Sequence, residues 1–174
     1  ILDIDATSEG RSPNFAMIKS ASSFSQTPLS VGGGISSLSD MESLLRVGAD
    51  KVVINSQLIS NPSLIEEGAH QFGSQCVIAS IDAINYGNGY RAYNRLTNNT
   101  DLTVNDLAKR SEDFGAGEIF LNSVDRDGMK IGFDIELASE VRQYASLPLI
   151  LCGGVGKSSD LVEGVKSGVE AVAA

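Results

Sequence analysis

A (β/α)8 (TIM) barrel is the fold class that the sequence predicts, and three observations lead to it. Short apolar runs alternate with amphipathic segments throughout the 174 residues. The apolar runs are nearly continuous in Ile, Val, Leu and Ala, which is typical of strands buried on both faces of a parallel sheet. An internal repeat then favours a closed barrel over an open, doubly wound sheet.

The expected strands and helices follow one another in strict alternation. Strands are expected at residues 1–4, 28–31, 51–54, 76–81, 118–121, 148–151 and 170–173, and helices near 14–24, 38–47, 61–72, 103–114, 134–145 and 158–167. Asn61-Pro62 and Ser159-Asp160 predict two helix starts, because each pair supplies a capping side chain followed by a residue suited to the first turn. Four glycines follow helices where a left-handed cap is wanted, namely Gly48, Gly73, Gly115 and Gly168.

The internal repeat has a period of 120 residues. It places Gly33-Gly34 on Gly153-Gly154, Asp40 on Asp160, Met41 on Leu161, Gly48 on Gly168, Val52 on Val172 and Ile4-Asp5 on Val124-Asp125. Such a period covers about four βα units and predicts two fused half-barrels in a whole of about 250 residues. With seven strands and six helices, residues 1–174 are expected to form a single barrel domain that runs from strand 2 to strand 8 and is incomplete at both ends.

The composition excludes several classes of protein. The chain has 13 Lys and Arg against 22 Asp and Glu, a formal charge of −9 and scattered basic residues, so a nucleic-acid partner is not expected. No apolar run approaches the roughly 18–20 residues of a membrane span. Cys76 and Cys152 lie within apolar runs, which is typical of reduced thiols in a cytoplasmic protein. The one histidine, His70, has no partners at metal-ligand spacing, and neither a metal nor another cofactor is expected.

The carboxyl ends of the expected strands carry the candidate functional residues, because barrel enzymes place their active sites there. Asp82 directly follows an apolar run and is the candidate for general acid–base catalysis. The alternative is that Asp82 caps a helix or forms a loop ion pair. Asp125, Asp127 and Gly128 follow another apolar run and are candidates for substrate binding.

Two groups of residues predict phosphate binding, because glycine lets backbone N–H groups approach an anion closely. The first group is Gly34, Asn55 and Ser56, and the second is Gly128, Gly154 and Gly156. The repeat places the two groups on opposite sides of the barrel mouth, which favours a ligand with a phosphate at each end. The alternative is that these glycines only form tight turns.

Several motifs together resemble one enzyme family. They are Val31-Gly32-Gly33-Gly34-Ile35, Gly48-Ala49-Asp50-Lys51-Val52, Ile54-Asn55-Ser56, Phe72-Gly73-Ser74-Gln75, Ile81-Asp82-Ala83, Gly115-Ala116-Gly117-Glu118-Ile119 and Asp125-Arg126-Asp127-Gly128. Over essentially its whole length the chain is similar to the cyclase subunit of imidazole glycerol phosphate synthase, commonly called HisF. The Ile-Asn-Ser, Ser-Ile-Asp-Ala and Asp-Arg-Asp-Gly motifs carry the specificity, since the sister isomerase of histidine synthesis shares Gly-Gly-Gly-Ile.

The resemblance implies ammonia-dependent lyase and cyclase chemistry on a bis-phosphorylated ribulosyl aminoimidazole carboxamide nucleotide, as part of histidine biosynthesis. A class I glutamine amidotransferase (HisH-like) subunit would supply the ammonia, forming a heterodimer with the barrel. Lys51 and Glu118 match the charged ring through which ammonia enters, and the alternative for them is an ordinary solvated ion pair. Asp82 matches one of two aspartates that act as general acid and base, and the other lies on strand 1. We therefore expect residues 1–174 alone to be inactive.

Some stretches depart from the cyclase. Residues 90–101 lack its usual glycine-bearing substrate loop, and Cys152 stands where the cyclase usually has serine. Residues 5–7, 10–15 and 121–123 look more like HisF-like paralogues, which are associated with ammonia delivery for amidating a sugar in surface-polysaccharide and nonulosonic-acid biosynthesis. That activity, and a non-catalytic barrel that serves as partner of a glutaminase, remain alternatives to the cyclase.

Overall fold

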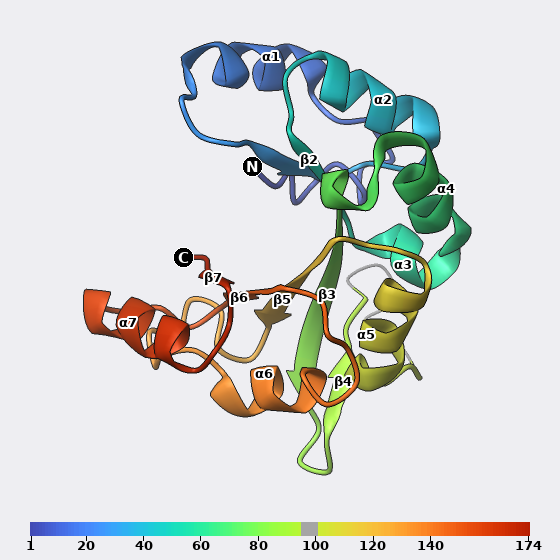
Figure 1. Cartoon of the computed structure of the whole chain (residues 1–174). Coiled ribbons are helices and arrows are strands. Elements are labelled where there is room, and N and C mark those ends of the chain that lie inside the picture. Colours follow the sequence, from blue (N-terminus) through green and yellow to red (C-terminus); the bar gives the residue numbers. More distant parts are fainter. Residues whose placement is uncertain (95–100) are drawn as a thin grey trace. The chain divides into compact units, whose positions relative to one another are not determined.

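Parallel strands that alternate with helices make up the fold, as the sequence predicts (Figure 1). The computed structural model describes residues 1–94 and 101–174. The chain divides into two compact units, the first made of residues 1–79 and 114–117 and the second of residues 80–113 and 118–174. The strand order and the parallel pairing confirm the (β/α)8-barrel class.

The first unit contains three parallel strands and the helices that follow them. In chain order these are α1 (Phe15–Phe24), β1 (Ser30–Gly32), α2 (Leu38–Arg46), β2 (Lys51–Ile54), α3 (Ser56–Ser60), α4 (Ser63–Phe72), the single 3-10 turn η1 (Ser74–Cys76) and the start of β3 (Val77–Asn85). β2 pairs with β1 on one side and with the start of β3 on the other. Its residues Val52, Val53 and Ile54 are buried, as expected for a strand covered on both faces.

The predicted strand at residues 1–4 is present only as a bridge between Leu2 and Gly32. Asp3 still donates its N–H to the Gly32 carbonyl at 2.9 Å, so the segment lies parallel to the end of β1. The Asp3 side chain then accepts the N–H of Ala6 at 3.2 Å. An aspartate that bonds the backbone ahead of it starts a turn, and here it ends the strand after the bridge.

The second unit contains the rest of β3 and four further strands. Its elements in chain order are β4 (Tyr90–Ala92), α5 (Val104–Asp113), β5 (Glu118–Ser123), α6 (Ile135–Val141), β6 (Leu149–Cys152), α7 (Ser158–Lys166) and β7 (Ala171–Val172). β5, β6 and β7 continue the parallel order from β3. β4 lies antiparallel beside β3 (Figure 1).

Strand β4 is absent from the sequence-based prediction, and β3 is longer than predicted because β4 pairs with its end. The two strands form a hairpin in which the N–H of Tyr86 donates to the Gly89 carbonyl at 3.1 Å. Gly87 and Gly89 both have positive φ. Two closely spaced glycines ahead of a strand-forming tyrosine are a typical hairpin signal, which the alternation of strands and helices does not include.

Two predicted helix starts differ from the structure by one or two residues. α4 begins at Ser63, with Pro62 rather than Asn61 at the cap. α7 begins at Ser158, with Lys157 rather than Ser159 at the cap, and Asp160 lies in the first turn as predicted. The glycines after the helices behave as predicted, since Gly48, Gly73, Gly115 and Gly168 all have positive φ.

The predicted repeat is visible in equivalent hydrogen bonds at the starts of α2 and α7. The Asp40 carboxylate accepts the N–H of Ser36 at 3.1 Å. At the position 120 residues later, the Asp160 carboxylate accepts the N–H of Gly156 at 2.9 Å. Each aspartate also lies near the positive end of its helix dipole, so the same local stabilisation recurs in both units.

Candidate functional site

Asp82 and Asn122 form the central contact of the site in the second unit. Asp82 lies within β3 and Asn122 within β5. The Asn122 side-chain amide donates to Asp82 Oδ1 at 3.0 Å, over a sequence separation of 40 residues. Because Asp82 lies inside a strand, the alternative that it caps a helix is wrong. Sequence reasoning selected Asp82 but not its partner, which only the pairing of neighbouring strands identifies.

Cys152 extends this cluster to a third strand. It pairs with Asn122 in the register of β5 and β6. Burial, as the main cause, raises the pKa of the Cys152 thiol, and the negative charges of Asp127 and Asp82 raise it further. Cys152 therefore stays a neutral thiol at neutral pH rather than a reactive thiolate.

The loop after β5 carries three more site candidates of this unit, Asp125, Asp127 and Gly128. The carboxylate of Asp125 accepts the N–H of Asn85 at 2.6 Å, and so joins this loop to the end of β3. Asp127 and Gly128 are exposed on the same loop. Asp125 thus has a structural bond in addition to its predicted role in substrate binding.

A buried carboxylate, Asp134, holds this loop in place. Asp134 is 3% exposed and accepts hydrogen bonds from Tyr90 Oη at 2.9 Å, Ser123 Oγ at 3.2 Å and the Leu137 N–H at 3.2 Å. Arg126 Nε lies 3.4 Å from the same carboxylate. Burial, together with the hydrogen bond to Asp134, raises the pKa of Tyr90 to about 12. Sequence reasoning missed this group, although Asp134 is the counterpart in the repeat of the helix cap Asn14.

The glycines before α2 and α7 have a packing role. Gly33 and Gly153 both have positive φ, and a side chain at either would meet a backbone carbonyl oxygen, that of Asp3 or of Ser123. Gly154 likewise packs against Gly132, which donates its N–H to the Gly154 carbonyl at 2.7 Å. Close packing alone thus accounts for glycine at these positions, as in the tight-turn alternative, so the case for phosphate binding depends on the space beside them.

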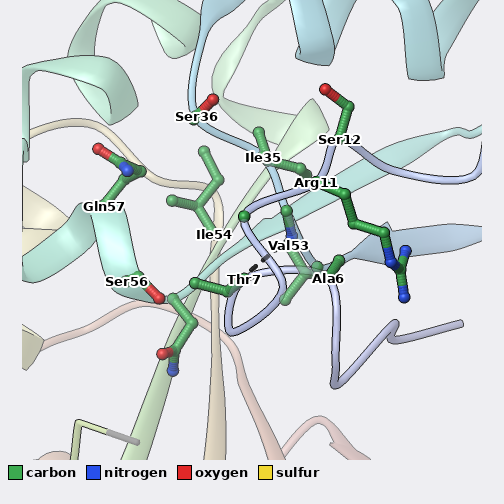
Figure 2. A pocket seen from close by; sticks show the side chains of 14 residues that line it. Ala6, Thr7, Arg11, Ser12, Ile35, Ser36, Val53, Ile54, Ser56 and Gln57 are labelled. Carbon is green, nitrogen blue, oxygen red and sulfur yellow. Dashed lines mark hydrogen bonds between the residues drawn. The ribbon is translucent and has the colours of Figure 1, made fainter. Parts of the chain in front are cut away.

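The first unit provides such a space in a pocket of about 290 Å³. All three residues of the first predicted phosphate group, Gly34, Asn55 and Ser56, line it. The Gly34 N–H donates to Thr7 Oγ1 at 3.3 Å, which ties the loop of residues 6–12 to the glycine turn (Figure 2). The lining combines hydroxyl, amide and backbone groups with the apolar side chains of Ala6, Ile35, Val53 and Ile54, and its polar groups suit a polar or anionic ligand.

Arg11 contributes to the pocket wall but does not point into it. Figure 2 shows its side chain extending away from the Ser56 and Thr7 side chains. Its guanidinium instead makes two bonds to Asp3, at 2.5 and 2.9 Å, and one to Glu9 at 2.5 Å. The bonds from Arg11 lower the pKa of Asp3 below its usual value and tie the loop of residues 6–12, which lines the pocket, to the segment before it.

Lys51 and Glu118, the residues matched to the ammonia entrance, begin two strands. Lys51 is the first residue of β2 in the first unit, and Glu118 is the first residue of β5 in the second. Both are half-buried. Each therefore lies at the amino end of its strand, at the opposite end from the site residues of the same unit.

The described part of the chain gives no sign of a metal site or a membrane segment. No group of three or more His, Cys, Asp or Glu side chains within residues 1–94 and 101–174 could hold a metal ion. None of the helices described has the length and apolar character needed to cross a bilayer. The segment 90–101 lacks the usual substrate loop of the cyclase, and its residues 95–100 lie outside the described residues.

Comparison with known proteins relates the whole chain to one family. The model of the family described as histidine biosynthesis protein matches residues 1–174. The putative imidazole glycerol phosphate synthase subunit hisF2 of Vibrio vulnificus (strain YJ016) is 44% identical over 174 residues, which cover 99% of this chain and 64% of that protein. The imidazole glycerol phosphate synthase subunit HisF of Bacillus cereus (strain G9842) is 45% identical over 170 residues, or 93% of this chain and 65% of that protein. The chain thus spans slightly less than two thirds of the length of these relatives.

Proposed function

The chain belongs to the histidine biosynthesis protein family, and from this premise we propose that it is part of the cyclase subunit of a glutamine-dependent imidazole glycerol phosphate synthase. The observation that supports this most directly is the contact between Asp82 and Asn122 at the carboxyl ends of adjacent strands, where barrel enzymes perform their chemistry. In this proposal residues 1–174 belong to one barrel domain, and the reaction takes place in the cytoplasm. Two free cysteines, Cys76 and Cys152, agree with a reducing compartment.

The proposed substrate is the bis-phosphorylated aminoimidazole carboxamide nucleotide, with ammonia as the second reactant. Asp82 would serve as one of the two general acid–base groups. Two members of the second group of predicted phosphate-binding residues, Gly128 and Gly154, would bind one end of the substrate together with Asp125 and Asp127. The pocket of the first unit would bind the phosphate at the other end, and its lining by Gly34, Asn55 and Ser56 supports that role. No cofactor is required for these steps.

The proposed source of ammonia is a class I glutamine amidotransferase subunit. Both relatives described above are named as subunits of a synthase, which agrees with such a partner. Lys51 and Glu118 lie at the amino ends of their strands, so we assign them to the entrance on the partner's side of the barrel. Binding of the glutaminase would therefore leave the substrate side of the barrel open.

The test uses the full-length protein that carries this chain, with ammonium salt at high pH replacing the glutaminase. Loss of substrate absorbance should follow addition of the nucleotide. Asp82→Asn should lower kcat by at least about 100-fold, because one general acid–base group contributes about 10²–10⁴-fold. Asp113→Asn, at an exposed position on α5, is the matched control and should keep wild-type activity.

Three results would contradict parts of this proposal. Full turnover by Asp82→Asn would remove Asp82 from the mechanism. A folded wild-type protein that neither converts nor binds the nucleotide would instead indicate the sugar-amidating paralogue. Turnover by residues 1–174 alone would overturn the expectation that this part of the protein is inactive by itself.

A further inference from the structure

Two buried side-chain oxygens in the described part of the chain have no hydrogen-bond partner, Asn105 Oδ1 and Asn122 Oδ1. Buried polar groups in folded proteins nearly always have a partner, because an unsatisfied one loses its bonds to water without replacement. Each such atom therefore needs a reason. For Asn122 the reason lies in what the other end of the same amide does.

The carboxylate of Asp82 fixes the orientation of the Asn122 amide. The amide nitrogen faces Asp82 Oδ1 at 3.0 Å. Turning the amide over would bring its oxygen against the carboxylate oxygen, which is repulsive. The amide oxygen must therefore point to the other side, where Gly153 packs so closely that a Cβ on that glycine would lie 3.1 Å from it.

We propose that Asn122 is a positioning residue for Asp82 and that the chain keeps it for this role although it leaves a buried oxygen unsatisfied. The inference rests on the proposed function, which makes Asp82 an acid–base group. Leucine has the same branched shape as asparagine and would lose both the bond to Asp82 and the unsatisfied oxygen, so the stability that asparagine gains from the one is offset by the cost of the other. What asparagine adds is an N–H donor that holds one carboxylate oxygen of Asp82 and so sets the plane of the carboxylate for proton transfer.

Asn105 provides a matched control within the same unit. Its amide nitrogen donates to Glu140 Oε1 at 2.9 Å, and its own oxygen is likewise buried and unpartnered. The bond joins α5 to α6 and involves no strand-end residue of the site. Replacing either asparagine removes the same kind of amide–carboxylate bond, but only one of the two replacements affects Asp82.

The kinetic test compares Asn122→Leu and Asn105→Leu in the full-length protein, with ammonium salt and the nucleotide as substrates. We expect Asn122→Leu to lower kcat by about 10- to 100-fold, with the KM for the nucleotide within about twofold of wild type. Its thermal midpoint should change by about as much as that of Asn105→Leu, since each variant loses one amide–carboxylate bond and one unsatisfied oxygen. Asn105→Leu should leave kcat and KM unchanged.

An unchanged kcat in Asn122→Leu, or an equal fall in Asn105→Leu, would overturn the proposal. If Asn122→Leu does not fold, Asn122→Ala removes the donor without adding bulk or charge beside Asp82. The same loss of kcat is expected for it, and wild-type activity would be contrary to the proposal.

A second measurement does not depend on turnover. The side-chain amide of Asn122 can be followed by ¹⁵N NMR in the wild-type protein and in Asp82→Ala. A shift of this resonance, with the Asn105 amide unchanged, supports the bond to Asp82, and its absence overturns it. Suppose that the resonance is shifted between wild type and Asp82→Ala while the wild-type protein does not convert the nucleotide. In that case the proposed function fails, and the positioning of Asp82 by Asn122 stands.

Discussion

Replacing Tyr90 by phenylalanine removes one hydroxyl from the buried group around Asp134. The hydroxyl donates to the Asp134 carboxylate at 2.9 Å, and Tyr90 itself is 7% exposed. Asp134 would keep Ser123, the Leu137 N–H and Arg126 as partners, so its charge would not be left uncompensated. A hydrogen bond to a charged group contributes about 1.5–3 kcal/mol. We therefore expect Tyr90→Phe to lower the free energy of unfolding by about 2 kcal/mol at pH 7.5.

The same variant has a characteristic pH dependence. In the folded protein the pKa of Tyr90 is raised from 10.0 to about 12, by burial and by Asp134. Between these values the unfolded chain has lost the phenolic proton while the folded protein retains it, so folding becomes less favourable as the pH rises. The stability contributed by Tyr90 is thus fully present below about pH 10 and is lost towards pH 12. The difference between wild type and Tyr90→Phe should shrink over this interval.

Urea unfolding of wild type and variant at pH 7.5 and pH 11 measures both effects. Tyr144→Phe is the control, because Tyr144 is 49% exposed and its loss of a hydroxyl should change stability by less than about 0.5 kcal/mol. A Tyr90→Phe protein as stable as wild type at pH 7.5 would show that the hydroxyl contributes nothing. A difference of the same size at both pH values would refute the linkage to the tyrosine proton.

Three other changes test the first unit. Gly33→Ala should prevent stable folding or lower the free energy of unfolding by several kcal/mol, since φ is +104° and a Cβ would meet the Asp3 carbonyl. Gly168→Ala is the control, because φ is +92° but the space around it is open, and it should cost only about 1 kcal/mol in chemical denaturation. Asn14→Ala removes the cap of α1 and should cost about 1 kcal/mol in the same assay. Arg11→Ala should return the pKa of Asp3 towards its ordinary value, which NMR titration measures. Wild type loses stability as the pH falls through the lowered pKa of Asp3, and the variant should lack this loss. An unaltered Asp3 titration would contradict the assigned pairing.

Much of the fold could be predicted because it is encoded locally. The predicted strand at 51–54 coincides with β2, because a short run of consecutive apolar residues is enough to specify a strand that is covered on both faces. The glycines after the helices have the positive φ that their position predicts. The predicted strand at 1–4 shortened to a bridge because the Asp3 side chain competes for the backbone ahead of it.

The candidate site was predictable only in part. Asp82 was predicted because a carboxylate directly after an apolar run is unusual. The structure places it beside Asn122 and close enough to Cys152 for its charge to raise the pKa of that thiol. The roles of Asn122 and Asp134 had no such signal. An asparagine within a strand and an aspartate before a helix are common, and their importance comes from partners that the linear pattern does not reveal.

The sequence by itself determined most of the strands and helices, the order of the βα units and the 120-residue repeat, because these depend on the spacing of apolar residues and glycines along the chain. Only the tertiary structure decided that Asn122 bonds Asp82 across 40 residues and that Tyr90 bonds Asp134 across 44. These contacts depend on the register of neighbouring strands and on a hairpin that brings Tyr90 back along β3. A one-residue change of register would turn each side chain to the opposite face, so the site exists only once the sheet has formed.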